Sequence, residues 1–506
     1  MPAQLSTRAQ VNGYRFLLRR LDHAMVRRDI RMLHDPMRSQ LRSLIVGAVL
    51  AVLLVAGCSI LAFIRPQGTI GDKAKIVMGK DSGALYIVDR DQNDASRMTL
   101  HPVLNLASAR LITGSNEAPK SVKDAKLNNV PRGPLQGIPG APAALLGSGQ
   151  GDHSNWTLCD TVRTGRTGAA GPAGGVQTTA VVGKLDLSSR VRAADRDAAL
   201  LVRSGDKTYL VYDGKRAQVD TQNSVMARTL NLAAQPPRPV SLGLLGAAAE
   251  VPLLTPPVIP HADEPGPGRL GNMRVGTVMR VGGTAEANKS DLYVVLDDGV
   301  QNISPFTAQV LRNADSHGMS DIPQLPPDVL DGMRIAKGDL PVDDFPAEVP
   351  KIVRVEDAPV ACMAWSKDPG TAPGRKDAAE GPADRAGVTL LTGTRLPLPD
   401  SAAPMDLASG NGGGSRADSV YVPPATGEFI QVTGTEAGSV RRDGLFYVSD
   451  NGIRYGIPDV ATAEVLGLGR TPRLAPWAVV SQLVPGPMLD KQSALVTRDV
   501  LLYDKH

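Results

Sequence analysis

The sequence predicts an α+β protein with an amphipathic helix, one transmembrane helix and a large exported region of small hairpin-plus-helix repeats. Three observations predict this class. Residues 44–64 form a 21-residue run without a charge. Four later segments share one tyrosine-bearing strand pattern, and most end in Asp-Gly or Asn-Gly. The 52 Gly and 40 Pro, with only 4% aromatic residues, favour a loop-rich β structure over a helical bundle.

The apolar run at 44–64, LIVGAVLAVLLVAGCSILAFI, is long enough to cross a bilayer. As a helix it would span ~31 Å, close to the ~30 Å hydrocarbon core. A cleaved signal peptide has a shorter apolar run after a shorter basic start. A lipoprotein signal at Val55-Ala56-Gly57-Cys58 is the other alternative, but residues 59–64 stay apolar after the cysteine. We therefore expect an uncleaved single-pass anchor.

Charge predicts the orientation of this anchor. Residues 1–43 contain nine Arg and three Asp, a net charge of +6. The whole chain carries +4, so the remainder sums to −2. The positive-inside rule therefore predicts a cytoplasmic N-terminus and a periplasmic bulk. The slightly acidic tail also argues against nucleic-acid binding, although the sequence pI is near 8.9.

The head, residues 1–43, contains a basic amphipathic helix with Asn12 as the expected N-cap and Pro36 as the residue that ends or kinks it. Apolar side chains recur at helical spacing, and they are the candidate partner-contact residues: Tyr14, Leu17, Leu18, Leu21 and Met25. Such a helix can lie on anionic headgroups or dock on the cytoplasmic surface of a partner, and the sequence leaves both open.

The four repeats are the main signal in the tail. Their tyrosine-bearing runs are GALYIVD from Gly83, KTYLVYDG from Lys207, DLYVVLDDG from Asp291 and GLFYVSDNG from Gly444. After each turn a second strand, a helix-start signal and a short helical run are expected. In the last three copies the helix-start signals are Asp220-Thr221, Ser304-Pro305 and Pro458-Asp459. One hairpin with one helix cannot bury its own apolar face, so the copies must pack on each other or on something between them.

Cys159 and Cys362 are an even pair in an exported region, which is most simply one disulfide. The alternative is two independent buried thiols. Each cysteine has a tryptophan three residues away, in WTLC and CMAW. The region around Cys362 and residues 388–398 could supply a central strand layer tied to Cys159.

No catalytic, cofactor or metal site is predicted. The sequence has no Gly-x-x-x-x-Gly-Lys-Ser/Thr, no Gly-x-Ser-x-Gly and no His-Glu-x-x-His. The seven histidines are scattered, and none lies at ligand spacing from another. The triplet Asp152-His153-Ser154 and the pairs at 297–298 and 343–344 are interpreted as surface loops and turn charges.

The opening block MPAQLSTRAQVNGYRFLLRRLDHAMVRRD, the single span, the four repeats and the lone exported cysteine pair resemble the EccB family of mycobacterial type VII (ESX) secretion systems, most closely its ESX-5-type members. The resemblance implies an elongated periplasmic region with four repeats, similar to phage lysin wall-binding modules, around a central domain in a quasi-twofold arrangement. It implies assembly in the inner membrane with an EccC-type ATPase, EccD, EccE, the mycosin protease and other copies of the chain. It implies no catalytic residue.

The expected segments are listed in chain order. They are the cytoplasmic helix at 1–43, the transmembrane helix at 44–64, repeat 1 at 70–125, repeat 2 at 150–250, repeat 3 at 270–325, central segments and loops at 326–435, and repeat 4 with a C-terminal strand at 436–506.

Three functions follow from this reading. The first is a structural core subunit of a type VII secretion machine, which builds the periplasmic part of the complex that exports mycobacterial proteins. The second is a peptidoglycan-binding anchor of that complex. The four repeat tyrosines would then be exposed rings that stack on sugars of the cell wall, whereas as strand residues they can instead face a core. The candidate wall contacts are Tyr86, Tyr209, Tyr293 and Tyr447. The third is an ATP-binding or ATP-hydrolysing component, because family members have been labelled ATPases; the missing phosphate-binding motif argues against it.

Overall fold

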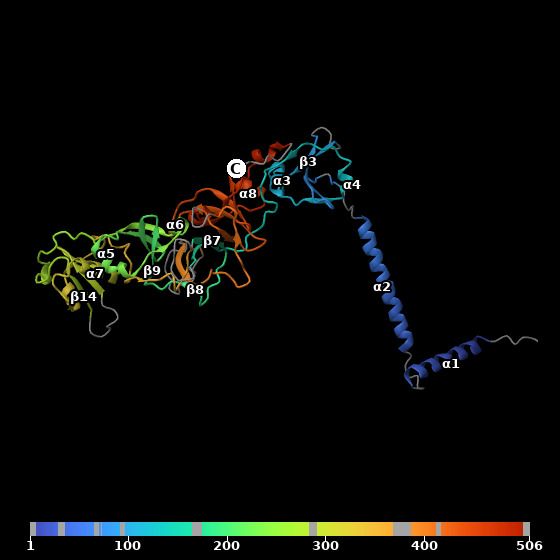
Figure 1. The fold of residues 1–506 in the computed structure, drawn as a ribbon. Helices are drawn as coiled ribbons and strands as arrows, with labels where there is room; N and C mark the ends of the chain where they lie inside the picture. The colour runs from blue at the N-terminus through green and yellow to red at the C-terminus, as the bar shows by residue number, and fades with distance from the viewer. Residues whose placement is uncertain are drawn as a thin grey trace, which may run out of the picture. The chain divides into compact units, whose positions relative to one another are not determined.

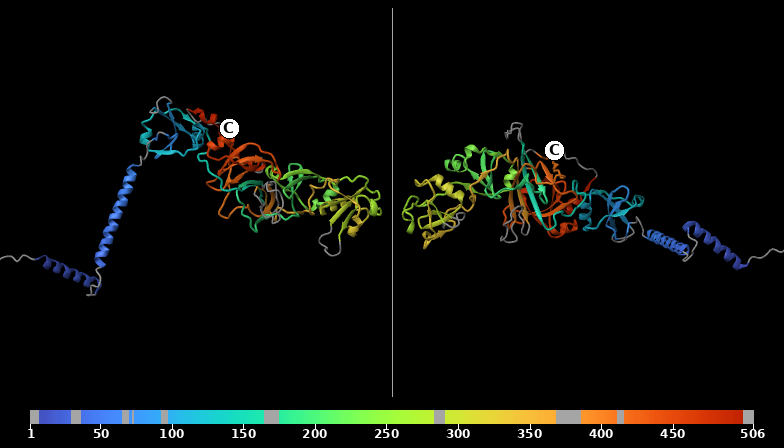
Figure 2. Two further views of the ribbon diagram at one scale, coloured as in Figure 1. Left: turned by 180° about the vertical axis from the view of Figure 1, so that it is seen from behind. Right: turned by 90° about the horizontal axis from the view of Figure 1, so that it is seen from below.

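The computed structural model describes residues 7–28, 36–64, 70–71, 73–91, 97–163, 175–282, 291–367, 386–410 and 416–498. The chain divides into two compact units, Met1–Gly71 and Asp72–His506. Figures 1 and 2 show the ribbon, and each unit is described by itself below.

The described residues of the first unit form two helices, α1 (Arg8–Arg27) and α2 (Pro36–Ile64). The expected N-cap at Asn12 is wrong: α1 begins one turn earlier, because Thr7 and Gln10 form the N-terminal cap, with Thr7 N donating to Gln10 Oε1 at 2.9 Å. Pro36 is the first residue of α2, where its missing N–H has no helical acceptor to lose. Within α2, residues 41–60 are long and apolar enough to cross a membrane.

Among the residues that the structure describes, the second unit contains five sheets. Four of them belong to the repeats and share one topology: an antiparallel three-stranded meander, a helix, a strand parallel to the first, a short helix, and a strand parallel to the third. The two parallel strands at the edges and the second helix go beyond the predicted strand–turn–strand–helix pattern.

The elements of the repeats are as follows. Repeat 1 contains β1 (Ile76–Gly79), β2 (Leu85–Arg90), β3 (Met98–Val103), α3 (Leu106–Thr113), β4 (Lys120–Val122), α4 (Asp124–Leu127) and β5 (Leu135–Gln136). Repeat 2 contains β9 (Ala198–Ser204), β10 (Lys207–Tyr212), β11 (Lys215–Val219), α5 (Ser224–Thr229), β12 (Arg238–Pro239), α6 (Leu242–Gly246) and β13 (Ala249–Leu254). Repeat 3 contains β14 (Val278–Val281), β15 (Asp291–Val295), β16 (Gly299–Ile303), α7 (Pro305–Ala314), β17 (Gln324–Leu325), η3 (Pro327–Leu330) and β18 (Arg334–Ala336). Repeat 4 contains β24 (Gly427–Thr433), β25 (Leu445–Ser449), β26 (Ile453–Ile457), α8 (Val460–Val465), β27 (Arg473–Pro476), α9 (Trp477–Val480) and β28 (Val484–Pro485).

The fifth sheet is the central one, with seven strands in the order β22-β23-β7-β6-β20-β21-β8. One part comes from β6 (Ser154–Val162), β7 (Val176–Val182) and β8 (Val191–Ala193). The other comes from β20 (Val360–Lys367), β21 (Gly387–Gly393), β22 (Met405–Asp406) and β23 (Ser419–Tyr421). Repeats 2 and 3 are therefore inserted between two halves of one sheet, coloured teal and orange in Figure 2.

This arrangement differs from several of the expected bounds. Repeat 1 runs on to β5 and repeat 3 to β18, beyond the expected ends at 125 and 325. Residues 154–193 belong to the central sheet and not to repeat 2, which begins at β9. Repeat 4 begins at β24, before the expected start at 436, because its first strand precedes the tyrosine-bearing one. These errors have the same cause: the strand pattern marks a local β run, whereas its sheet is decided by hydrogen bonds to distant segments.

The repeats pack in two pairs. Repeats 1 and 4 share a core in which Leu111 of α3 meets Tyr455 and Leu466. Repeats 2 and 3 share another, in which Met226 of α5 meets Phe306 of α7, and Figure 1 shows the two helices side by side. The C-terminal segment reinforces the first pair, because α10 (Lys491–Leu495) packs on α3 and β29 (Thr497–Arg498) pairs with β5 of repeat 1.

The central sheet lies between the two pairs. Its core includes Leu200 of β9 and Leu245 of α6 from repeat 2, and Ile430 of β24 and Val480 of α9 from repeat 4. The short helices α6 and α9 both contact β6 and also contact each other. Each pair of repeats thus joins the central sheet through equivalent elements, which is the quasi-twofold relation that the family resemblance implies.

The predicted Asp-Gly hairpin turns are present in part. Asp213 and Gly214 form a two-residue hairpin with φ of 42° and 74°, the positive values that an Asp-Gly turn requires. In repeat 3 the glycine of Asp298-Gly299 already lies in β16, where a Cβ would come 2.2 Å from the carbonyl oxygen of Arg334 on β18. The lack of a side chain at this glycine allows the edge strand β18 to approach closely. It does not serve a turn. Two of the three expected helix starts are confirmed, since Ser304 and Asp459 are the N-caps of α7 and α8. The third, at Asp220-Thr221, is wrong, because α5 begins after Asn223, whose Oδ1 accepts from Val225 N at 3.0 Å.

We expect Gly214→Ala to lower the free energy of unfolding by about 1–2 kcal/mol, because Gly214 has a positive φ and an added Cβ would lie 3.0 Å from Cβ of Val388. The matched control is Gly246→Ala, since a Cβ there meets nothing within 4 Å. Denaturant unfolding of the full chain in detergent, followed by tryptophan fluorescence, measures both. Equal losses in the two variants would contradict the assignment of the strain to the 213–214 turn.

Candidate functional site: the disulfide and polar cluster of the central sheet

The centre of the second unit is the pairing of β6 with β20. Cys159 lies directly opposite Cys362 in this antiparallel pair, and the structure joins them by a disulfide with a Cα–Cα distance of 4.0 Å. Trp156 lies opposite Trp365 in the same register. All four side chains are buried.

The two motifs WTLC and CMAW run in opposite order along the chain, as antiparallel pairing requires when Trp faces Trp and Cys faces Cys. The sequence therefore contained a register signal beyond the cysteine pair itself. The bridge spans 203 residues of sequence, and that segment carries repeats 2 and 3. It consequently fastens the base of the insertion.

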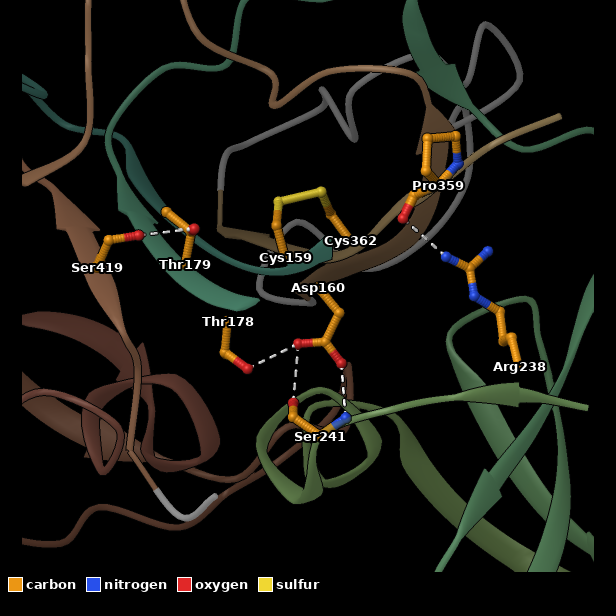
Figure 3. Close-up of a disulfide and its surroundings, with 9 residues drawn as sticks. All are labelled: Cys159, Asp160, Thr178, Thr179, Arg238, Ser241, Pro359, Cys362 and Ser419. Carbon is orange, nitrogen blue, oxygen red and sulfur yellow. Dashed lines mark hydrogen bonds between the residues drawn. A yellow bond between two sulfur atoms is a disulfide. The ribbon is translucent and has the colours of Figure 1, made fainter. Parts of the chain in front are cut away.

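A buried carboxylate follows directly after Cys159. Asp160 is 2% exposed and accepts three hydrogen bonds. Ser241 donates twice, from its backbone N at 2.7 Å and from Oγ at 2.9 Å, and Thr178 Oγ1 donates at 2.9 Å. Figure 3 shows these bonds converging on the carboxylate.

Ser241 is also the N-cap of α6, and its Oγ accepts from Leu244 N at 3.0 Å. Asp160 therefore joins the central sheet to the start of the repeat 2 helix that packs on it. Burial raises the pKa of Asp160 to about 6, against the lowering effect of the hydrogen bonds from Ser241 and Thr178 and of the nearby Arg238 charge.

Arg238, on β12 of repeat 2, makes the second connection to the central segments. Its guanidinium donates to the carbonyl oxygens of Ala358 at 2.9 Å and Pro359 at 3.0 Å, just before β20 begins. Figure 3 shows the bond to Pro359. Burial lowers the pKa of Arg238 to about 10, opposed by the charge of Asp160. Thr179 and Ser419 add a hydroxyl contact of 2.8 Å between β7 and β23, also drawn in Figure 3.

The cluster connects the central sheet to repeat 2 through buried hydrogen bonds. Its polar atoms are occupied by one another and by backbone groups, and the residues drawn in Figure 3 come from the central sheet and the adjoining parts of repeat 2. Buried, fully hydrogen-bonded groups of this kind fix one relative arrangement of the elements they join.

The four repeat tyrosines lie in or against cores. Tyr447 is 0%, Tyr86 7% and Tyr293 9% exposed, and Tyr209 is partly buried against the central core. The hydroxyl of Tyr447 accepts from Leu146 N at 2.8 Å, and the guanidinium of Arg132 lies 5.5 Å from the ring centre of Tyr86. This burial favours the structural interpretation of the four rings.

The candidate partner-contact side chains of α1 are exposed. Tyr14, Leu17, Leu18, Leu21 and Met25 are each at least 44% exposed, Leu18 being the least so. Within its own unit α1 therefore leaves its apolar face uncovered.

The side chains weighed for catalysis have structural partners. Ser154 Oγ donates to the carbonyl oxygen of Leu474 at 2.7 Å. Asp298 pairs with Arg334 at 2.8 Å, and Asp344 with Lys215 at 2.8 Å.

The structure also gathers one group that the sequence does not reveal. His317 Nδ1 lies 3.0 Å from an oxygen of Asp263 and 3.8 Å from one of Asp315. Asp263, Asp315 and His317 thus form a group of potential metal-ligand atoms among the described residues. Arg274 Nη1 lies 3.9 Å from Asp263, so a cation is already beside these carboxylates. Asp263 and His317 are 54 residues apart, and only the fold of repeat 3 brings them together.

The chain is similar to known proteins along nearly its whole length. The family described as "Type VII secretion system ESX-1, transport TM domain B" matches residues 3–503. The chain is 37% identical to "ESX-3 secretion system ATPase EccB3" of Mycolicibacterium smegmatis, over 98% of this chain and 91% of that protein. It is 33% identical to "ESX-5 secretion system ATPase EccB5" of Mycobacterium tuberculosis, over 99% and 95%.

Two solved structures are similar along the whole or most of the chain. A chain of the intact ESX-5 inner membrane complex has a TM-score of 0.69 and 30% identity, covering 100% of this chain and 98% of its own. A chain of the EccB3 dimer from the ESX-3 core complex has a TM-score of 0.67 and 34% identity, covering 84% and 100%. The identities do not single out the ESX-5 type that the sequence resemblance favoured.

We expect the double variant Cys159→Ser/Cys362→Ser to lose about 2–5 kcal/mol of unfolding free energy, because the bridge closes a very long loop in the unfolded chain. The control is Cys58→Ser, which changes an exposed cysteine of α2. Denaturant titrations under non-reducing conditions compare the two. A double variant as stable as the control would show that the bridge contributes nothing to stability.

We expect Asp160 to make stability depend on pH between about 4 and 6. Burial raises its folded pKa to about 6 from the ordinary aspartate value of 3.8, so the folded state binds the proton more tightly than the unfolded state. The stabilising contribution of this proton is present below pH 4 and is lost as the pH rises to 6, by roughly 3 kcal/mol.

Asp160→Asn removes this titration. It also replaces one of the two acceptor oxygens by an NH2 group, which lowers the unfolding free energy by an amount that does not depend on pH in this range. The unfolding free energy of the unsubstituted chain minus that of Asp160→Asn should therefore fall from pH 4 to 6 and be flat above pH 6.5. A difference that rises with pH would mean that the carboxylate is stabilised in its charged form.

Proposed function

This chain belongs to the EccB family of type VII secretion membrane proteins, and from that membership we propose that α2 anchors it with residues 1–43 in the cytoplasm and Asp72–His506 in the periplasm. EccB proteins are core subunits of ESX inner membrane complexes, and this chain is such a subunit. Nine arginines lie before the apolar run, and the slightly acidic region follows it. This charge asymmetry supports the orientation.

The observation that carries a structural role is the construction of the second unit. Five sheets are joined by shared cores, by a disulfide and by a buried polar cluster, and the polar groups of that cluster are used for joining. We propose that this unit builds part of the periplasmic assembly of the complex and contacts further copies of the chain there. The solved relatives, one within an ESX-5 inner membrane complex and one as an EccB3 dimer, support this proposal.

The cytoplasmic contact is assigned to α1. Its exposed apolar face is the surface that we propose docks on the membrane-embedded partners: an EccC-type ATPase, EccD or EccE. The mycosin protease belongs to the periplasmic side of the same proposal. Recognition of peptidoglycan by the repeats is a separate property, and the burial of the repeat tyrosines favours packing over sugar stacking.

The printed names of the relatives include the word ATPase. This sequence lacks the Gly-x-x-x-x-Gly-Lys-Ser/Thr loop that cradles phosphates, and in the proposed orientation most of the chain lies away from cytoplasmic ATP. We therefore assign the chain a structural function.

The test is mild detergent extraction of the tagged chain from its native membrane, followed by native electrophoresis and mass spectrometry. We expect the chain to migrate in a complex many times heavier than its own 53.2 kDa, together with an FtsK-like ATPase. Free protein of the monomer mass under mild extraction would contradict the proposal.

The α1 assignment has its own variant. Leu17→Asp/Leu21→Asp should reduce the recovery of the cytoplasmic partners at least several-fold, because it places two charges on an apolar docking face. Arg15→Gln/Asp22→Asn changes polar positions of the same helix with no change in net charge, and should leave recovery intact. If both variants lose partners equally, the apolar face is not the contact.

A further inference from the structure

The four repeats share a topology but differ at one edge. This edge consists of the strand parallel to the first meander strand and the short helix after it. Its sequences are KSVKDAKL at 120–127, RPVSLGLLG at 238–246, QLPPDVL at 324–330 and RLAPWAVV at 473–480. Because each copy has the same order and pairing of elements, the topology does not require these differences in composition.

In two copies the composition follows from what the edge contacts. The helices α6 and α9 pack on β6 of the central sheet, and both are apolar. In repeat 3 the same position carries Asp328, which pairs with Arg269 at 3.6 Å. Repeat 1 is the copy in which this edge is rich in lysine.

We call this surface the lysine edge and define it as Lys75, Lys80, Lys120, Lys123 and Lys126. Lys120 lies opposite Val77 in the β1–β4 pair, and Lys80 N donates to the carbonyl oxygen of Val122 on β4. Lys75 immediately precedes β1, while Lys123 and Lys126 lie at the start of and within α4. All five are exposed, and none is paired with a carboxylate of the residues the structure describes.

Two carboxylates lie in the same region. Asp124 is turned toward the β1–β2 turn, where it accepts from Ser82 Oγ and from the backbone N of Asp81 at 2.8 Å. The hydrogen bond from Ser82, with that of Asp81, lowers the pKa of Asp124. Counting Asp81 and Asp124, the edge keeps a net charge of +3.

The lysine edge belongs to repeat 1, the repeat that follows α2 directly in the sequence. Eleven residues separate Ile64, the end of α2, from Ile76, the start of β1. A fully extended chain of this length reaches at most ~40 Å. Repeats 2, 3 and 4 are not connected to α2 by such a short segment of chain.

We propose that the lysine edge of repeat 1 binds anionic phospholipid headgroups at the periplasmic surface of the membrane that α2 crosses. The inference rests on the proposed function, because it requires α2 to be the anchor. The charge of the edge complements phosphate groups, and the short connection supplies a high local concentration of them. A basic segment near an anionic surface gains about fivefold in binding per lysine, and the gain decays within a Debye length.

The test uses amine labelling of the full chain in lipid nanodiscs. Residues 1–72 contain no lysine, so an amine-reactive reagent reports on the second unit and the N-terminal amine only. Labelling of each lysine is measured by mass spectrometry in neutral phosphatidylcholine discs and in discs with one-third phosphatidylglycerol. Lys207 of repeat 2, which is also exposed, is the internal control.

We expect the lysine edge to be labelled at least threefold less in the anionic discs, with Lys207 unchanged, and we expect 0.5 M salt to remove the protection. In Lys120→Gln/Lys123→Gln the protection of the remaining edge lysines should fall, whereas Lys207→Gln should leave it unchanged.

Three outcomes would overturn the proposal. Equal labelling in neutral and anionic discs would exclude headgroup recognition. Protection that appears only in the assembled secretion complex would assign the edge to a partner protein. Protection of Lys207 to the same degree would indicate a general charge effect.

Failure of the anchor is recognised separately, since a chain that does not remain in the nanodisc contradicts the proposed function itself. A chain that remains in the disc with a fully labelled edge contradicts only this inference.

Discussion

The structure depends on the pairing of β6 with β20. These two strands are the middle of the seven-stranded sheet, yet about 200 residues of chain lie between them, which makes their pairing costly in loop-closure entropy. The disulfide between Cys159 and Cys362 removes much of that cost by restricting the unfolded chain. Once the pair is formed, repeats 2 and 3 emerge from its base as an insertion, and repeats 1 and 4 lie beside it in sequence.

The repeats need this arrangement because none has a sufficient core of its own. A three-stranded meander with one helix leaves an apolar face open. The open faces are closed in pairs, by α3 with repeat 4 and by α5 with α7. The central sheet then covers the remaining apolar helices, α6 and α9. Asp160, Ser241 and Arg238 fix the angle of one of these contacts with directional bonds that apolar packing alone does not supply.

Repetition of one fold with divergent edges suits a scaffold. Equivalent positions are apolar where they meet the central sheet, acidic in repeat 3 and basic in repeat 1. The topology is thus repeated within the chain while its surfaces differ, so that each copy can meet a different neighbour. A protein of this kind acts through the placement of surfaces, which is consistent with membership of a secretion complex.

The sequence by itself determined the features that depend on neighbouring residues. The apolar length of α2, the hairpins, the N-caps at Ser304 and Asp459 and the paired cysteines follow from local pattern and composition. The tertiary structure alone decided which sheet each strand joins. It placed 154–193 in the central sheet, added parallel edge strands of two to six residues, and buried the rings of Tyr86, Tyr293 and Tyr447. The physical reason is that a helix satisfies its hydrogen bonds within one segment, whereas a strand satisfies them with a partner that can be hundreds of residues away.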